Sequence, residues 1–190
     1  MSKEQVVHPE HYNQGIECWD YTTSHNMGFL DGNVDYRRDI HMGMYTELNI
    51  GLELKKDTPD EVINIIEYMI SDKEQDRPTT PNHPLFSTNR WDVMLTCGSY
   101  YFNAKPVHRF EYDEIGRCWF LTNVSNLKNY NSEIEKFLDW ISPYINDDGF
   151  FGYMRYEEDA MPTLLINDKF NHKIRLKYDD GEERVLAIGK

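Results

Sequence analysis

A strict alternation of apolar and polar residues runs from residue 45 to residue 55. The apolar positions are all leucine or isoleucine, at Leu48, Ile50, Leu52 and Leu54. Because successive side chains of a strand point to opposite faces of a sheet, this pattern predicts a strand with one buried face.

A helical pattern follows this strand. Thr58 is predicted to cap the helix, Pro59 to occupy its first position, and Glu61, three residues after Thr58, to complete a capping box. Apolar residues three and four positions apart form one stripe that can face a sheet, at Val62, Ile65, Ile66 and Met69. Since this stripe stops at Met69, we expect the helix to end near residue 70.

A second helix is predicted from residue 132 by the same spacing, with Ser132 as the cap and Glu135 three residues later. Its apolar stripe consists of Ile134, Phe137, Leu138, Ile141 and Ile145. Several carboxylates stand in the first turns of both helices, where they stabilise the positive end of the helix dipole. We interpret these acids as structural.

Shorter alternating segments predict the remaining strands. Three strands are expected between the helices, at residues 91–97, 107–112 and 117–124, after a proline-marked surface loop at residues 73–90. Further strands are expected at residues 150–157, 162–166, 173–178 and 184–188. The order β-α-β-β-β-α-β with a terminal meander predicts an α+β fold, in which two helices cover one face of a mixed or antiparallel sheet. A ferredoxin-like variant is the leading architecture, formed by residues 44–190 as a single domain.

The chain is strongly acidic. It carries 33 acidic and 20 basic residues, a net charge of −13, and 39% hydrophobic residues, which suffice for a folded core. The charge repels phosphate backbones and anionic lipid, so we expect neither direct nucleic-acid binding nor membrane binding. The start of the chain lacks the pattern of a signal peptide, and we expect a cytoplasmic location in a host cell.

Signatures of common chemistry are missing from the sequence. The three cysteines, Cys18, Cys97 and Cys118, form no CxxC pair and are interpreted as reduced thiols, mostly buried. The sequence has no GxxxxGK[ST], GxGxxG or GxSxG motif. We therefore expect no cofactor and no metal site, and catalysis is left open with a non-enzymatic role favoured.

The first 43 residues differ in character from the rest. The run from His8-Pro9 to His11-Tyr12, the segment at residues 15–20 and the Gly-Asn pair at Asn33 resemble the opening of the bacteriophage domain family DUF3310, which includes a phage nucleotide kinase. The resemblance implies a phage or prophage origin, and it implies nucleotide contacts for His8, His11, Tyr12 and Asn33. The family's helical half does not follow, so residues 1–43 are interpreted as a truncated head segment.

One cluster near the C-terminal third is the best candidate for an interaction edge. It combines aromatic side chains with consecutive acids, at Tyr153, Arg155, Tyr156, Glu157, Glu158 and Asp159. Tyrosine beside carboxylates suits the binding of a cationic surface. The alternative is a strand edge that charge protects from aggregation. A second aromatic run at residues 100–102 is either core or a platform for stacking bases.

Three functions are compatible with these features. The leading hypothesis is a phage-encoded acidic accessory binding protein, whose partner is a host protein with a basic surface and which inhibits a defence or nucleic-acid-binding protein. The second is a protein that binds or modifies a small nucleotide. The third is an immunity-type inhibitor of a toxin, which would share the acidic character of the first and differ in its partner.

Overall fold

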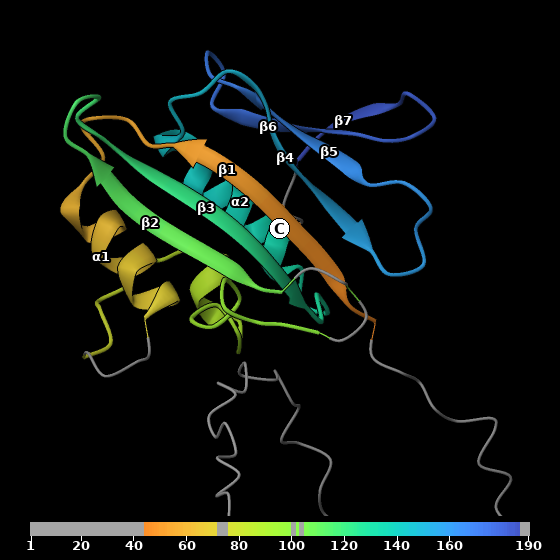
Figure 1. Ribbon diagram of the computed structural model, residues 1–190, viewed down its shortest axis with the longest axis horizontal. Coiled ribbons are helices and arrows are strands. Elements are labelled where there is room, and N and C mark those ends of the chain that lie inside the picture. The colour runs from red at the N-terminus through yellow and green to blue at the C-terminus, as the bar shows by residue number, and fades with distance from the viewer. Residues whose placement is uncertain (1–43, 72–75, 100–101, 103–104, 187–190) are drawn as a thin grey trace, which may run out of the picture.

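The computed structural model describes residues 44–71, 76–99, 102 and 105–186 (Figure 1). They form one sheet of seven strands in the order β2-β3-β1-β4-β5-β6-β7, in which all neighbouring strands are antiparallel. The strands are β1 (Thr46–Glu53), β2 (Val107–Asp113), β3 (Cys118–Leu127), β4 (Gly149–Tyr156), β5 (Thr163–Asp168), β6 (Lys173–Lys177) and β7 (Glu183–Val185). The helices are α1 (Asp60–Ile70) and α2 (Glu133–Ile141), with short 3-10 turns η2 (Pro84–Ser87) and η3 (Ser142–Tyr144). The predicted α+β class is confirmed.

The connections follow a β-α-β-β-α-β order, and β5, β6 and β7 then extend the sheet as a meander. The prediction of a strand at residues 91–97 is wrong. Helix-like turns form there, with the amide of Met94 bonded to the carbonyl of Arg90 at 2.9 Å and that of Cys97 to the carbonyl of Val93 at 3.1 Å. The ferredoxin-like variant stays a prediction.

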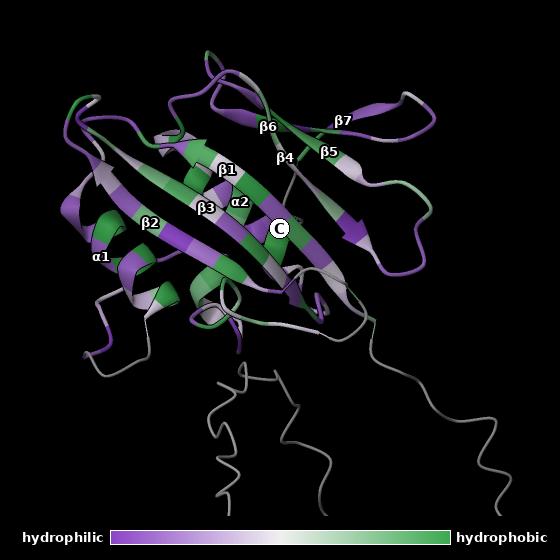
Figure 2. Cartoon of the chain, in the orientation of Figure 1, coloured by the Kyte–Doolittle hydropathy of each residue, from purple (hydrophilic) through white to green (hydrophobic). Residues whose placement is uncertain are grey.

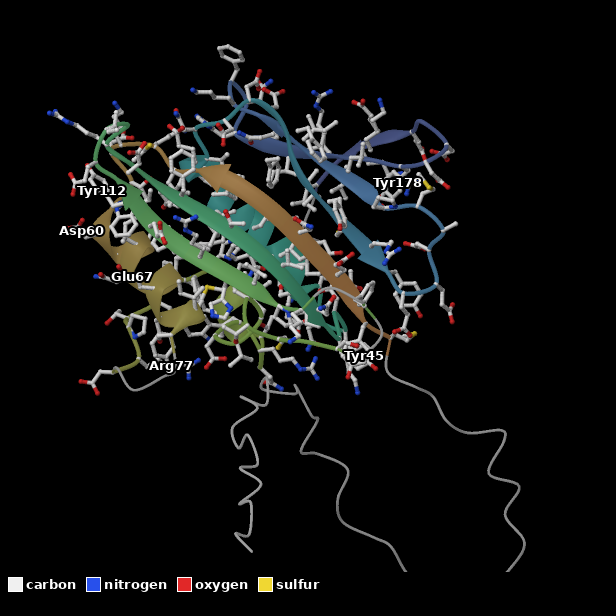
Figure 3. All side chains as sticks on the ribbon, viewed as in Figure 1. Tyr45, Asp60, Glu67, Arg77, Tyr112 and Tyr178 are labelled. Carbon is white, nitrogen blue, oxygen red and sulfur yellow. The ribbon has the colours of Figure 1, made fainter. Side chains whose placement is uncertain are left out.

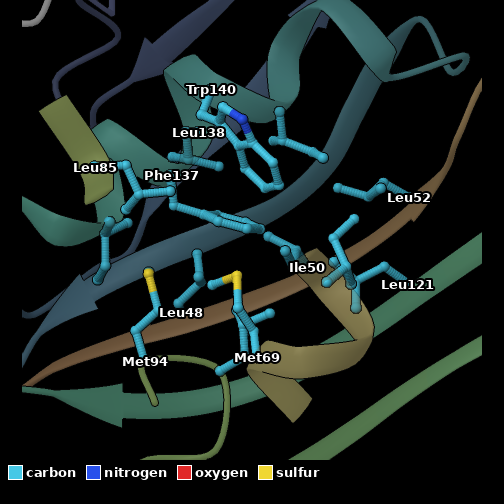
Figure 4. Close-up of a cluster of buried hydrophobic side chains, with 14 of the residues drawn as sticks. Leu48, Ile50, Leu52, Met69, Leu85, Met94, Leu121, Phe137, Leu138 and Trp140 are labelled. Atoms are coloured by element: carbon cyan, nitrogen blue, oxygen red, sulfur yellow. The ribbon is translucent and has the colours of Figure 1, made fainter. Parts of the chain in front are cut away.

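Both helices lie on one face of the sheet, behind it in Figure 1. The alternating residues Leu48, Ile50 and Leu52 of β1 point into this layer and are buried. Figure 2 shows the same alternation as hydrophobic and hydrophilic bands along the strands. Phe137 and Met69 meet these residues from the two helices and fill the centre of the core (Figure 4).

Neither helix begins as the capping pattern predicts. The residue that caps α1 is Pro59, and the hydroxyl of Thr58 instead donates to the carbonyl of Lys55 at 2.7 Å. Ser132 has a left-handed backbone (φ 54°) and makes no side-chain cap. The side chain of Asn129 takes over this role, because its Oδ1 accepts from the amide of Ile134 at 3.0 Å. The helices were located correctly, and their caps were not.

The predicted surface loop also contributes to the core. Leu85 in η2 is fully buried, and the ring of Phe86 packs edge-on against Trp91 and Trp140, with centroids 5.1 and 5.3 Å apart. His83 Nε2 lies 3.1 Å from the carboxylate of Asp139 on α2. This connection is therefore anchored to the helix layer.

The cysteine prediction holds in part. Cys118 is a free, buried thiol. Burial is the main cause that raises the pKa of this thiol, and the charge of Glu53 raises it further. Cys97 is buried but disulfide-bonded, so the expectation of a reduced thiol is wrong there. Within the described residues, no helix is long and apolar enough to cross a membrane.

Candidate interaction surfaces

The cluster expected as one edge is divided by the structure. β4 lies between β1 and β5, so Tyr153 and Arg155 belong to an interior strand and the interpretation of a strand edge is wrong. These two side chains lie on the face away from the helices, which we call the open face, because Met154 between them packs on the core. Tyr156 lies on the helix side of the sheet, in line with Met154. Whether the cluster binds a partner stays a prediction.

The acidic residues after Tyr156 have separate environments. Glu157 turns back to β1, where its Oε2 accepts from the amide of Tyr45 at 3.0 Å. Burial raises the pKa of the Tyr156 hydroxyl, and the charges of Glu158, Glu157 and Asp159 add to the effect. Tyr156 is therefore a neutral hydrogen-bonding group at neutral pH.

A row of polar side chains crosses the open face on β3, β1 and β4, with two buried members and one partly exposed member, Arg155. It consists of Asn126, Glu47 and Arg155, which are directly opposite one another in the strand register. Glu47 is only 5% exposed and Asn126 is fully buried. Arg155 Nε lies 3.8 Å from Glu47 Oε2, too far for a hydrogen bond. The ring of Phe102 lies 5.2 Å from the guanidinium carbon of Arg155.

Asn126 is the most unusual member of this row. Neither its Nδ2 nor its Oδ1 has a hydrogen-bond partner within the part of the chain that the structure describes. A buried amide without partners is costly, and such groups in folded proteins call for a functional or structural explanation. No local pattern predicts this row, because Glu47 is expected on a solvated face and Asn126 follows the end of the expected strand.

The next polar pair on the open face is joined by a hydrogen bond. Asn49 Nδ2 donates to the hydroxyl of Tyr153 at 3.2 Å, between directly opposed residues of β1 and β4. This bond fixes the Tyr153 ring against the sheet. Tyr153 therefore contributes a fixed aromatic surface beside the polar row.

An acidic hollow of about 220 Å³ lies where the β4–β5 turn meets the β6–β7 turn. Its charged members are Asp159 and Asp179, and its apolar surface comes chiefly from Met161 and the ring of Tyr178. Arg184 stacks on the same ring, with its guanidinium carbon 5.2 Å from the centroid. Arg184 already occupies this ring, so the two carboxylates are what make the hollow suit a cationic side chain.

A larger hollow, of about 470 Å³, lies over the β2–β3 hairpin at the opposite end of the sheet, as the positions of Tyr112 and Tyr178 in Figure 3 indicate. Its lining carries Arg109 against three acids, Glu111, Asp113 and Glu114. Arg109 donates to Glu111, and this bond lowers the pKa of that carboxyl. The excess of negative charge makes the hollow unfavourable for a phosphate.

The remaining candidates give less information. His8, His11, Tyr12 and Asn33, with the rest of the head segment, lie outside the described residues. Of the aromatic run at residues 100–102, the structure describes only Phe102, which is buried. Among the described residues, no three histidine, cysteine or acidic side chains are grouped to hold a metal ion.

Comparisons with protein-family models, curated proteins and solved structures found no match to this chain.

Proposed function

We propose that this chain is a phage-encoded acidic accessory protein that binds a basic protein of the host without catalysing a reaction. The observation that carries the proposal is the acidic hollow, which Asp159 and Asp179 line together with Tyr178. A lysine or arginine side chain of the partner would enter this hollow, placing its charge between the carboxylates and its alkyl part against Met161.

The physical basis is complementary charge and shape. A charged hydrogen bond is about twice as strong as a neutral one. The net charge of −13 extends this preference beyond the hollow, because it accelerates the approach of a positively charged protein. The hollow therefore provides specificity, and the whole surface provides attraction.

Inhibition of a defence or nucleic-acid-binding protein follows from the kind of partner. Proteins that bind nucleic acids expose basic surfaces, and an acidic protein that occupies such a surface competes with the phosphate backbone. The head segment's resemblance to a bacteriophage family supports a phage origin. An immunity-type role rests on the same physics with a toxin as the partner. The excess of acids in the larger hollow gives no support to the nucleotide hypothesis.

The test measures binding of a synthetic arginine- and lysine-rich peptide to the full chain by isothermal titration calorimetry. Asp159→Asn combined with Asp179→Asn should weaken binding by about tenfold or more, since two charged contacts are lost. Asp57→Asn combined with Glu61→Gln is the matched control, because it removes the same charge from exposed positions near the start of α1. Equal losses in both double variants would reduce the effect to net charge and refute the hollow as the site.

A further inference from the structure

The strand β2 forms one end of the sheet, and no described strand pairs with its outer side. Five of its seven residues are exposed, and the other two, Phe110 and Asp113, are partly buried. An uncovered edge strand presents backbone N–H and C=O groups that can pair with another strand. The strand at the opposite end, β7, has only three residues. The β2 edge is therefore the longer surface for strand pairing.

Two side chains of opposite charge stand on either side of the middle residue of β2, Phe110. Arg109 and Glu111 flank Phe110 on the open face, and their side chains are 69% and 57% exposed. Phe110 itself is held on the helix side by stacking on Trp119, with centroids 4.7 Å apart. Two antiparallel copies of β2 related by a two-fold axis at Phe110 would thus place each Arg109 opposite the Glu111 of the other copy.

Other registers are less favourable. Side chains keep their faces only when the two-fold axis passes through a residue, because neighbouring residues of a strand point to opposite faces. An axis at Arg109 would bring two arginines together, and an axis at Glu111 would bring two glutamates together. The axis at Phe110 also pairs all seven residues of the strand, so the longest overlap coincides with the complementary charges.

We infer that β2 binds the β2 strand of a second copy of this chain, with the two-fold axis at Phe110, so that the two sheets become continuous. The contact would also bring His108 of one copy opposite Tyr112 of the other, which is 43% exposed in the single chain. This inference is independent of the acidic hollow, which lies at the other end of the sheet (Figure 3).

The acidic surface limits the strength of this dimer. Each copy carries a net charge of −13, and Asp60 and Glu67 of α1 lie at the same end of the molecule as β2 (Figure 3). Both α1 helices would lie on the same side of the joined sheet, where their carboxylates repel. We therefore expect a dissociation constant of about 10 μM or higher, in the range of small, transient interfaces.

Sedimentation velocity of the full chain tests the inference, at concentrations up to about 500 μM, well above the expected dissociation constant. The chain should shift from monomer to dimer over this range. Arg109→Glu should weaken the dimer by about tenfold or more, because it places two carboxylates opposite each other at two positions. The double variant R109E/E111R exchanges the charges and should restore dimerisation.

Arg184→Glu on β7 is the matched control. Arg184 donates to Glu182, two residues away on an equally exposed surface, at the other end of the sheet. The Arg184→Glu substitution should leave the dissociation constant of the dimer unchanged. If R109E lost its circular dichroism spectrum, E111R would replace it, since it places two arginines together. A chain that stays monomeric at all concentrations, a dimer indifferent to R109E and E111R, or a double variant without recovery would overturn the inference.

Discussion

Asn126→Leu removes a side-chain amide that is fully buried on the open face and whose two polar atoms have no partner within the described residues. Leucine has the same branched skeleton, so it occupies nearly the same space without an unsatisfied donor and acceptor. Burying an unpaired amide costs about 1–3 kcal/mol in proteins. We therefore expect the substitution to raise the free energy of unfolding by about that amount.

The assay is thermal and urea unfolding followed by circular dichroism. In a chain of this length, 1 kcal/mol shifts Tm by about 2–4 °C, so Tm should rise by about 2–12 °C. Asn123→Leu is the matched control on the same strand. Asn123 is equally buried, but its Nδ2 donates to the carbonyl of Leu95 at 2.6 Å and its Oδ1 accepts from the hydroxyl of Ser125 at 2.9 Å. Asn123→Leu should lower the free energy of unfolding by about 2–4 kcal/mol, because the carbonyl of Leu95 and the hydroxyl of Ser125 lose their partner.

Changes of opposite sign in the free energy of unfolding at the two asparagines would show that Asn126 is retained at a cost to stability, as polar residues of functional sites often are. The polar row with Glu47 and Arg155 would then be the next surface to examine for ligand contacts. A loss of stability in Asn126→Leu as large as that in Asn123→Leu would refute the reasoning, because it would mean that the amide is satisfied.

Three further predictions concern packing and reactivity. Gly152→Ala should lower the free energy of unfolding by about 3 kcal/mol in urea titrations, because the added Cβ would lie 2.2 Å from the backbone oxygen of Asn49. Gly51→Ala is the control. The Cβ added there has no atom within 4 Å, so the free energy of unfolding should change by less than about 1 kcal/mol. Phe137→Ala should cost about 3–5 kcal/mol in the same assay, since the ring is fully buried in the core; a cost below about 1 kcal/mol would contradict the packing. The raised pKa of Cys118 leaves less thiolate at pH 8, so alkylation by iodoacetamide, followed by mass spectrometry, should be much slower in the folded chain than in urea, and equal rates would contradict its burial.

Local periodicity was sufficient to predict most of the fold. The alternation in β1 and the stripes of both helices determine which side chains are buried, because these patterns correspond directly to the faces of a strand or helix. The segment at residues 91–97 shows the limit of this reasoning. Its buried residues are Trp91, Met94, Leu95 and Cys97, spaced three, one and two residues apart. Because five of the seven residues are apolar, the sequence does not distinguish this spacing from alternation.

The candidate surfaces were less predictable. The acids at residues 157–159 lie in one run, but Glu157 turns to the backbone of Tyr45 and Asp159 lines the hollow with Asp179 from a distant turn. The burial of Glu47 depends equally on contacts between distant segments. Such relations arise from the order of strands in the sheet, and no local pattern encodes them. The charge of the chain predicts a basic partner, and the hollow is the site that we propose for it.

The most direct test of the acidic hollow as a binding site is a nuclear magnetic resonance titration of the isotope-labelled full chain with the arginine- and lysine-rich peptide. We expect the largest changes in amide chemical shift in the two turns that form the hollow, at residues 157–163 and 177–181. The exposed acids at the start of α1 report non-specific attraction within the same spectra. Changes of equal size at Asp57, Asp60 and Glu61, or no change at the two turns at a saturating peptide concentration, would contradict the account.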